Sequence, residues 1–173
     1  RKEKLFQWRS KTKEYSLTLG AAIHVLDLVC WMLGSMPTTV ITKSTKKLTK
    51  NTNYKKFSFA SYIFTYPNNV IVSLKADGVC AHPHFHEFKI FQKNQTFISN
   101  LNGQFEIKKA LRDNYKIIKR NYEYPDKRNR KKLIQKFLNT ILDKTRPLIS
   151  KKFLFDLMTA CFYADLSEKR SLW

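Results

Sequence analysis

The sequence predicts an α+β domain: a largely antiparallel, open β-sheet of about six or seven strands, with helices packed on one face. Three observations indicate this class. Residues 17–33 are apolar with helical spacing, residues 38–124 contain short runs of alternating character, and residues from 130 onward return to helical spacing. Tight turns join the short runs, which favours antiparallel pairing of neighbouring strands.

The first predicted helix spans residues 17–33 and follows a polar, irregular segment, 1–16. Gly34 comes directly after it, and glycine readily adopts the left-handed conformation that ends many helices. Pro37 lies three residues further on, where it no longer interrupts helical hydrogen bonds. The helix is therefore expected to end at Leu33.

Short runs rich in β-branched and aromatic residues predict the strands. The expected strands are 38–47, 57–66, 70–79, 84–91, 95–101, 104–110 and 115–122. The turn PNN at 67–69 joins two of them into a hairpin, and QKN at 92–94 joins another pair.

Two amphipathic helices close the chain. The first, 130–144, has one apolar face, and the segment 145–150 then interrupts the pattern at Pro147. Ser150 is a suitable N-cap for the second helix. The apolar stripe of that helix consists of Leu154, Leu157, Met158, Cys161, Phe162 and Leu166.

The composition indicates a globular, cytoplasmic chain. Its 173 residues fit one domain, or one domain and an appendage. The three cysteines are too few and too widely spaced for a disulfide framework, which favours a reducing compartment. No segment resembles a signal peptide or a membrane span, so no membrane partner is expected.

The net charge of +20 suits an acidic partner. However, 25 of the 33 basic residues are lysine and only 8 are arginine, and they are scattered along the chain. Lysine lacks the planar fork with which arginine grips phosphate. The charge is therefore only weak support for a dedicated nucleic-acid-binding protein, and it remains compatible with a small acidic substrate such as a sugar phosphate.

The first helix carries two titratable residues, His24 and Asp27, among apolar neighbours. At about 100° per residue they share a face with Gly20 and Trp31, within about 60° of one another. A buried polar group needs a partner. His24 is therefore either a core histidine satisfied by Asp27 or the backbone, or a general base that opens into a pocket.

A second candidate is the segment AHPHFHEF, which places His82, His84 and His86 on one side of an extended strand. Three imidazoles can bind zinc, but neighbours on one strand face stand about 7 Å apart, which is wide for one ion. No metal is therefore predicted. The histidines either face solvent or line a substrate pocket.

Residues 20–37, GAAIHVLDLVCWMLGSMP, resemble the motif that opens the C-terminal domain of the glucose–fructose oxidoreductase / inositol dehydrogenase / MocA family. The matching residues are His24, Asp27, Trp31, Leu33, Gly34 and Pro37, and Trp8 and Arg9 resemble the family's upstream Trp-Arg pair. The order of strands and closing helices is also similar. The resemblance therefore runs over nearly the whole chain.

The resemblance implies an NAD(P)-dependent oxidoreductase that acts on a sugar, a cyclitol or a nucleotide sugar. His24 would donate or accept the proton, with Asp27 orienting it. Arg9, Trp31, His84 and His86 are expected near the substrate. The resemblance also implies a homo-oligomer formed through the sheet face.

Two departures limit this interpretation. The family usually has an acidic residue four positions before its histidine, where this chain has Gly20, and KEYSLTLG replaces the family's glycine run.

The chain also has only four glycines and no G-x-G-x-x-G. We therefore expect residues 1–173 to be a C-terminal substrate-binding and oligomerisation domain. NAD or NADP would be bound mainly by an N-terminal Rossmann domain absent from this chain, which would be inactive alone. The alternative is a non-catalytic basic module, either nucleic-acid-binding or a degenerate scaffold.

Overall fold

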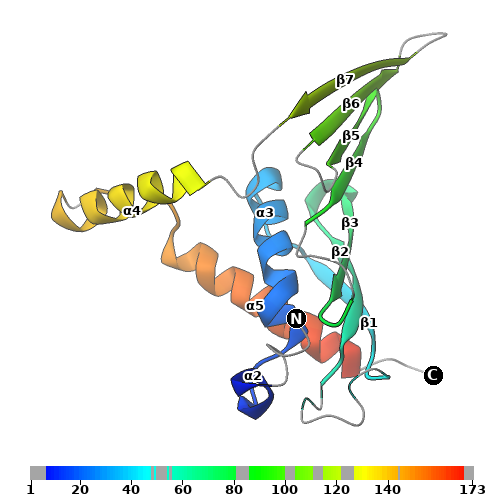
Figure 1. Cartoon of the computed structure of the whole chain (residues 1–173), viewed down its shortest axis with the longest axis vertical. Coiled ribbons are helices and arrows are strands. Elements are labelled where there is room, and N and C mark those ends of the chain that lie inside the picture. The colour runs from blue at the N-terminus through cyan, green and yellow to red at the C-terminus, as the bar shows by residue number, and fades with distance from the viewer. Residues whose placement is uncertain are drawn as a thin grey trace. The chain divides into compact units, whose positions relative to one another are not determined.

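The computed structural model confirms the predicted α+β class (Figure 1). It describes residues 7–47, 49, 54, 56–80, 86–99, 104–110, 115–121, 127–143 and 145–169. Within these residues seven strands form, and every pairing described between them is antiparallel. They pair as two sheets, of three and four strands. The chain correspondingly divides into two compact units, Arg1–Ala81 with Ile149–Trp173, and His82–Leu148.

The first unit contains the three-stranded sheet. Its strands β1 (Thr39–Thr45), β2 (Phe59–Thr65) and β3 (Ile71–Asp77) lie in sequence order. The turn η2 (Pro67–Asn69) joins β2 to β3, as predicted, and two of its residues have positive φ, 61° at Asn68 and 59° at Asn69. Asparagine tolerates this conformation better than most residues, so the hairpin is encoded locally.

The predicted first helix begins with a π-helical turn, η1 (Thr18–Ala22), and continues as the α-helix α3 (Ile23–Leu33). It ends where the sequence predicts, because Gly34 has a left-handed φ of 65°. The segment before it, predicted to be irregular, contains one helical turn, α2 (Trp8–Lys11). Four residues are too few to produce a periodic sequence signal.

The last helix of the first unit is α5 (Lys151–Lys169). The Phe153 amide donates a 3.1 Å hydrogen bond to the Ser150 hydroxyl, which confirms Ser150 as an N-terminal cap. Together α3 and α5 cover one face of the β1–β3 sheet (Figure 1). The core between these layers consists of Leu17, Ala22, Leu26, Cys30, Phe57, Ala60, Tyr62, Phe64, Tyr66, Leu74, Ala76, Leu157, Cys161 and Ala164.

The second unit contains β4 (Phe88–Gln92), β5 (Gln95–Ser99), β6 (Gln104–Ala110), β7 (Tyr115–Asn121) and the helix α4 (Lys127–Leu142). The four strands pair in sequence order. The register places Ile90, Phe97, Ile107 and Ile118 in one row across the sheet. The apolar stripe of α4 is exposed, at Leu133, Ile134, Phe137, Leu138, Ile141 and Leu142.

Within the described ranges, no helix combines the length and apolarity needed to cross a lipid bilayer. The three cysteines are free thiols, and Cys30 and Cys161 are fully buried in the first unit.

Candidate functional site

The helix α3 is buried on one side only. Leu26 and Cys30 face the core, as does Ala22 at the end of η1, whereas His24 is exposed on the other side. Trp31, two turns further along, is 75% exposed. The sequence suggested a buried polar stripe, because residues all around the wheel are apolar. A helix that lies on a single sheet buries only part of its circumference, so the His24 side of α3 remains at the surface.

His24, Asp27 and Trp31 share that side, since residues three, four and seven apart in an α-helix lie on one face. Asp27 is half-buried. We call these three residues, with Gly20 one turn before them, the His24 face. It brings an imidazole, a carboxylate and a large aromatic surface together in one place.

A buried network fixes the beginning of this helix. The Ile23 amide bonds to the Thr18 carbonyl five residues back, which defines the π turn. The Thr18 hydroxyl lies 2.9 Å from the Tyr62 hydroxyl and donates a 2.5 Å hydrogen bond to the Asp165 carboxylate. The network therefore joins η1 to β2 and α5. Such π turns are frequent near functional sites, where they redirect side chains.

Burial raises the pKa of two groups beside this network, the Tyr62 phenol and the Cys161 thiol. Loss of solvent raises the pKa of Tyr62, and its hydrogen bond with Thr18 offsets only part of that rise. Burial also raises the pKa of the Cys161 thiol to about 12, with a further contribution from the Asp165 carboxylate. At neutral pH these groups are consequently neutral hydrogen-bonding and packing elements.

A second cluster of side chains lies next to Gly20, at the N-terminal end of the His24 face. The Arg9 guanidinium carbon is 4.5 Å from the Trp8 ring centroid and 5.6 Å from that of Tyr15. Tyr15 contacts Trp8 and Tyr54 edge to face, each with ring centroids 6.3 Å apart. We call Trp8, Arg9, Tyr15 and Tyr54 the Tyr15 cluster. The sequence resemblance identified Arg9 but missed the two tyrosines.

Tyr15 fills the space where residue 20 would carry a side chain. A Cβ atom built on Gly20 would lie 2.0 Å from the Tyr15 hydroxyl oxygen and 2.3 Å from Cζ.

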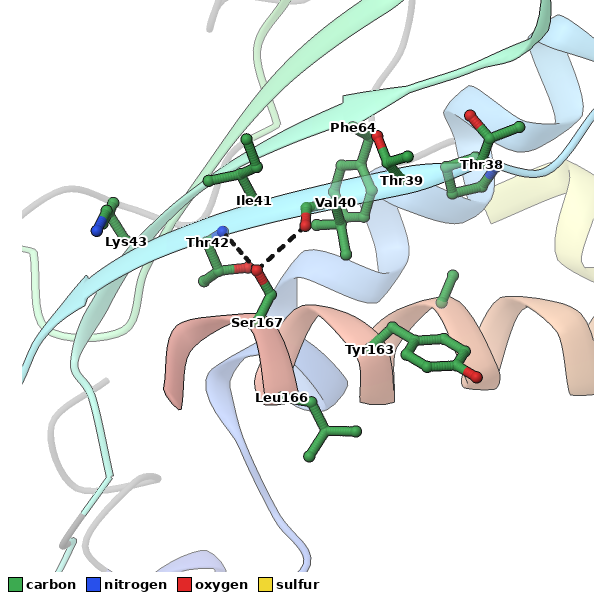
Figure 2. Close-up of a pocket in the computed structure, with 12 residues that line it drawn as sticks. Thr38, Thr39, Val40, Ile41, Thr42, Lys43, Phe64, Tyr163, Leu166 and Ser167 are labelled. Carbon is green, nitrogen blue, oxygen red and sulfur yellow. Dashed lines mark hydrogen bonds between the residues drawn. The ribbon is translucent and has the colours of Figure 1, made fainter. Parts of the chain in front are cut away.

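A separate groove of about 680 Å³ runs between β1 and α5 (Figure 2). Residues 37–43 form one wall, with Tyr163, Leu166 and Ser167 on the other. The Ser167 hydroxyl accepts a 3.2 Å hydrogen bond from the Thr42 amide and donates one of 3.1 Å to the Val40 carbonyl. Ser167 therefore hydrogen-bonds the backbone amide and carbonyl groups at this edge of β1, as a neighbouring strand would. The lining of the groove does not include His24, Asp27 or Trp31.

The remaining predicted residues lie in the second unit. His86 is half-buried and precedes β4, while His82 and His84 lie outside the described residues. Among the residues that are described, no group of three or more His, Cys, Asp or Glu side chains is arranged to bind a metal ion.

These features define a class: an α+β domain whose first long helix packs on an antiparallel sheet and presents a His-x-x-Asp face. Residues 2–98, more than half of the chain, match the family model described as GFO/IDH/MocA C-terminal domain. The chain therefore belongs to the glucose–fructose oxidoreductase / inositol dehydrogenase / MocA family, as a C-terminal domain.

Solved structures share the fold. UDP-N-acetylglucosamine 3-dehydrogenase GnnA from Acidithiobacillus ferrooxidans is similar with a TM-score of 0.71 and 20% identity, over 95% of this chain and 50% of that one. An NAD-binding protein from Listeria innocua gives a TM-score of 0.72 at 11% identity, over 94% and 48%. An oxidoreductase from Agrobacterium radiobacter, solved with NAD+, L-tartaric acid and magnesium, gives 0.67 at 12%, over 88% and 46%. The chain thus spans about half the length of these proteins. No curated protein matched.

Proposed function

We propose that this chain is the substrate-binding domain of an NAD(P)-dependent oxidoreductase that acts on a sugar, a cyclitol or a nucleotide sugar. One observation carries the proposal: His24, in a family-matched segment, is exposed on a helix face that the core does not need. The solved relative named as a UDP-N-acetylglucosamine 3-dehydrogenase supports a sugar as the substrate class.

In this proposal His24 accepts the proton of the substrate hydroxyl during oxidation and returns it during reduction. Imidazole suits that role because it exchanges protons near neutral pH. Asp27, three residues along the same face, would orient the imidazole and stabilise its protonated form. Trp31 would contribute an apolar surface against which a sugar ring can stack.

A nicotinamide cofactor would accept or supply the hydride. This chain has four glycines and no G-x-G-x-x-G, so its own residues do not provide the usual cradle for a pyrophosphate. We therefore propose that NAD or NADP is bound mainly by a Rossmann domain outside this chain. The relative solved with NAD+ is consistent with this arrangement.

The test is turnover by the full-length protein with the substitutions His24→Asn and His24→Ala. General acid–base groups typically contribute about 10²–10⁴-fold, so kcat should fall by that factor while circular dichroism stays unchanged. Met32→Leu, an exposed residue on the same helix, is the matched control. Turnover within a few-fold of the parent would exclude His24 as the acid–base group.

The alternative, a non-catalytic basic module, is favoured by Gly20 and by the charge of +20. It predicts no turnover of any sugar, cyclitol or nucleotide sugar by the full-length protein. If the module binds nucleic acid rather than being a degenerate scaffold, it also predicts retention of DNA through washing at physiological ionic strength. Saturable stabilisation by a nucleotide sugar would contradict it.

We further propose that the protein forms a homo-oligomer through the face of the β4–β7 sheet that carries the apolar row Ile90, Phe97, Ile107 and Ile118. Ile118→Lys should then reduce the mass measured by light scattering, because it places a charge in the contact. Ile117→Lys changes the adjacent residue, on the opposite face of the same strand, and should leave the mass unchanged. The reverse pattern would place the contact on the other face.

A further inference from the structure

We propose that Thr18 and Asp165 are positioning residues for the proton transfer at His24: their hydrogen bond holds the π turn η1, and this turn sets what lies beside the imidazole. The inference rests on the proposed function, because it assumes that His24 exchanges a proton with the substrate. It adds two residues that no sequence motif indicated, separated by 147 positions along the chain.

A π turn needs support from outside its own helix. It contains one residue more than an α turn, so the Ile23 amide bonds to the Thr18 carbonyl instead of the Leu19 carbonyl. Such turns are rare in soluble proteins, where the α turn is the usual conformation of a helical segment. Contacts with the rest of the fold must therefore stabilise η1.

The turn brings Thr18 into line with the buried side of α3. On a regular α-helix, residues eight positions apart differ by about 80° around the axis, so Thr18 would point well to one side of Leu26. The extra residue in a π turn reduces the angle per residue and rotates Thr18 back toward that side. Accordingly Thr18, Ala22, Leu26 and Cys30 are all at most 3% exposed. This rotation lets the Thr18 hydroxyl reach β2 and α5.

The hydrogen bonds of the Thr18 side chain supply the support that η1 needs. Its hydroxyl lies 2.9 Å from the Tyr62 hydroxyl of β2 and donates a 2.5 Å hydrogen bond to the Asp165 carboxylate of α5. Hydrogen bonds to a charged group are the stronger kind. Because Thr18 and Tyr62 are fully buried, an α turn that rotated Thr18 away would leave buried hydroxyls without these bonds. The carboxylate also lies beside the first turn of the helix, where the helix dipole favours negative charge.

The turn lies between two fixed points of the helix. Before it, the buried Ser16 caps the helix, since its hydroxyl accepts a 3.1 Å hydrogen bond from the Leu19 amide. After it, Leu26 and Cys30 are held in the core. The rotation of one fixed point relative to the other is therefore set by η1.

Gly20 lies inside the turn, and its position relative to His24 depends on this rotation. In a regular α-helix two residues four positions apart differ by about 40° around the axis. The wider turn reduces this angle, so Gly20, with the Tyr15 phenol packed against it, lies more directly in line with His24. If η1 became an α turn, both would move relative to the imidazole, and so would a substrate held against them.

The test compares three threonine variants of the full-length protein. Thr18→Val retains the shape of the side chain and removes the hydroxyl, whereas Thr18→Ser retains the hydroxyl. Thr42→Val is the matched control, because Thr42 of β1 is also buried, at 1% exposed, and its hydroxyl has no hydrogen-bond partner among the residues described. Circular dichroism and thermal unfolding establish a temperature at which all three variants are folded.

Thr18→Val should lower kcat about tenfold or more and leave KM within about threefold, because a small displacement beside the reacting atoms acts mainly on the chemical step. Thr18→Ser should restore most of kcat, and Thr42→Val should match the parent. Asp165→Leu should reproduce the loss seen in Thr18→Val. The two losses should not add in the double variant, because both substitutions remove the same hydrogen bond.

A crystal structure of the Thr18→Val protein gives a readout that does not depend on activity. We expect the Ile23 amide to bond to the Leu19 carbonyl, so that η1 becomes an α turn. A π turn that persists in Thr18→Val would overturn the inference. So would an unchanged kcat in Thr18→Val, or an equal loss of kcat in Thr18→Ser or Thr42→Val.

The parent protein and His24→Asn decide the proposed function separately. If the parent oxidises no sugar, cyclitol or nucleotide sugar with either nicotinamide cofactor, the function fails, and the crystal structure alone decides whether Thr18 holds the turn. If His24→Asn abolishes turnover while Thr18→Val leaves kcat unchanged, the function stands and the positioning role fails.

Discussion

The two sides of α3 differ in what the fold requires of them. Leu26 and Cys30 on one side are almost fully buried against the sheet and α5, so their identity follows from packing. On the other side, His24 is exposed and Trp31 is 75% exposed, and neither contributes much to the core. Packing therefore explains half of this helix. The other half is the one that we propose faces the substrate.

The largest expected effect is on the free energy of unfolding, and it distinguishes the two sides of α3. Leu26→Ala should lower the free energy of unfolding by about 2–5 kcal/mol, because it opens a cavity in the core. Trp31→Ala, on the same helix, should change it by less than about 0.5 kcal/mol. Urea denaturation measures both. A larger loss from Trp31→Ala than from Leu26→Ala would reverse the assignment of the two sides.

The next prediction tests the contact between Tyr15 and Gly20 on the His24 face. Gly20→Ala places a methyl group within 2.0 Å of the Tyr15 hydroxyl and should destabilise the protein by about 1–3 kcal/mol, as overpacking does. Tyr15→Ala removes the obstacle, so Gly20→Ala should be neutral or slightly stabilising in that background, because alanine favours a helix more than glycine does. A double-mutant cycle by thermal or urea unfolding gives the coupling. Additive effects would mean that Tyr15 does not occupy this space.

A smaller, pH-dependent effect concerns Cys161 of α5, which lies in the same buried core as Leu26 and Cys30. The unfolded chain releases the Cys161 proton near pH 9, whereas the folded chain holds it until about pH 12. Stability from this group is thus complete below pH 9 and falls by about 1.4 kcal/mol per pH unit between pH 9 and 12. Cys161→Ala should make the alkaline decline shallower. Its difference from the parent at pH 7 gives the packing contribution alone, and an identical alkaline slope in both proteins would contradict the prediction.

Local signals made much of the fold predictable. Gly34 ends α3, the PNN turn joins β2 to β3, and Ser150 caps α5, because in each case a few adjacent residues determine the conformation. The π turn at Thr18–Ala22 was not predictable. It differs from an α turn in one hydrogen-bond step and has no distinct residue pattern. The separation of the strands into two sheets likewise depends on pairing across the fold, which alternation alone does not encode.

The candidate site was predictable where helical spacing determines it. His24, Asp27 and Trp31 share a face because they are three, four and seven residues apart. The exposure of His24 and Trp31 was not predictable, because the apolar residues around them suggested burial on every side. The contact of Tyr15 with Gly20 was also missed, because it depends on how the segment before the helix folds back onto it.

The most direct measurement for the central claim is a crystal structure of the full-length protein with a nicotinamide cofactor and a substrate that it turns over. The account predicts that an imidazole nitrogen of His24 lies about 2.6–3.2 Å from the substrate oxygen whose carbon is oxidised. A substrate bound away from the His24 face, for example in the groove between β1 and α5, would contradict it.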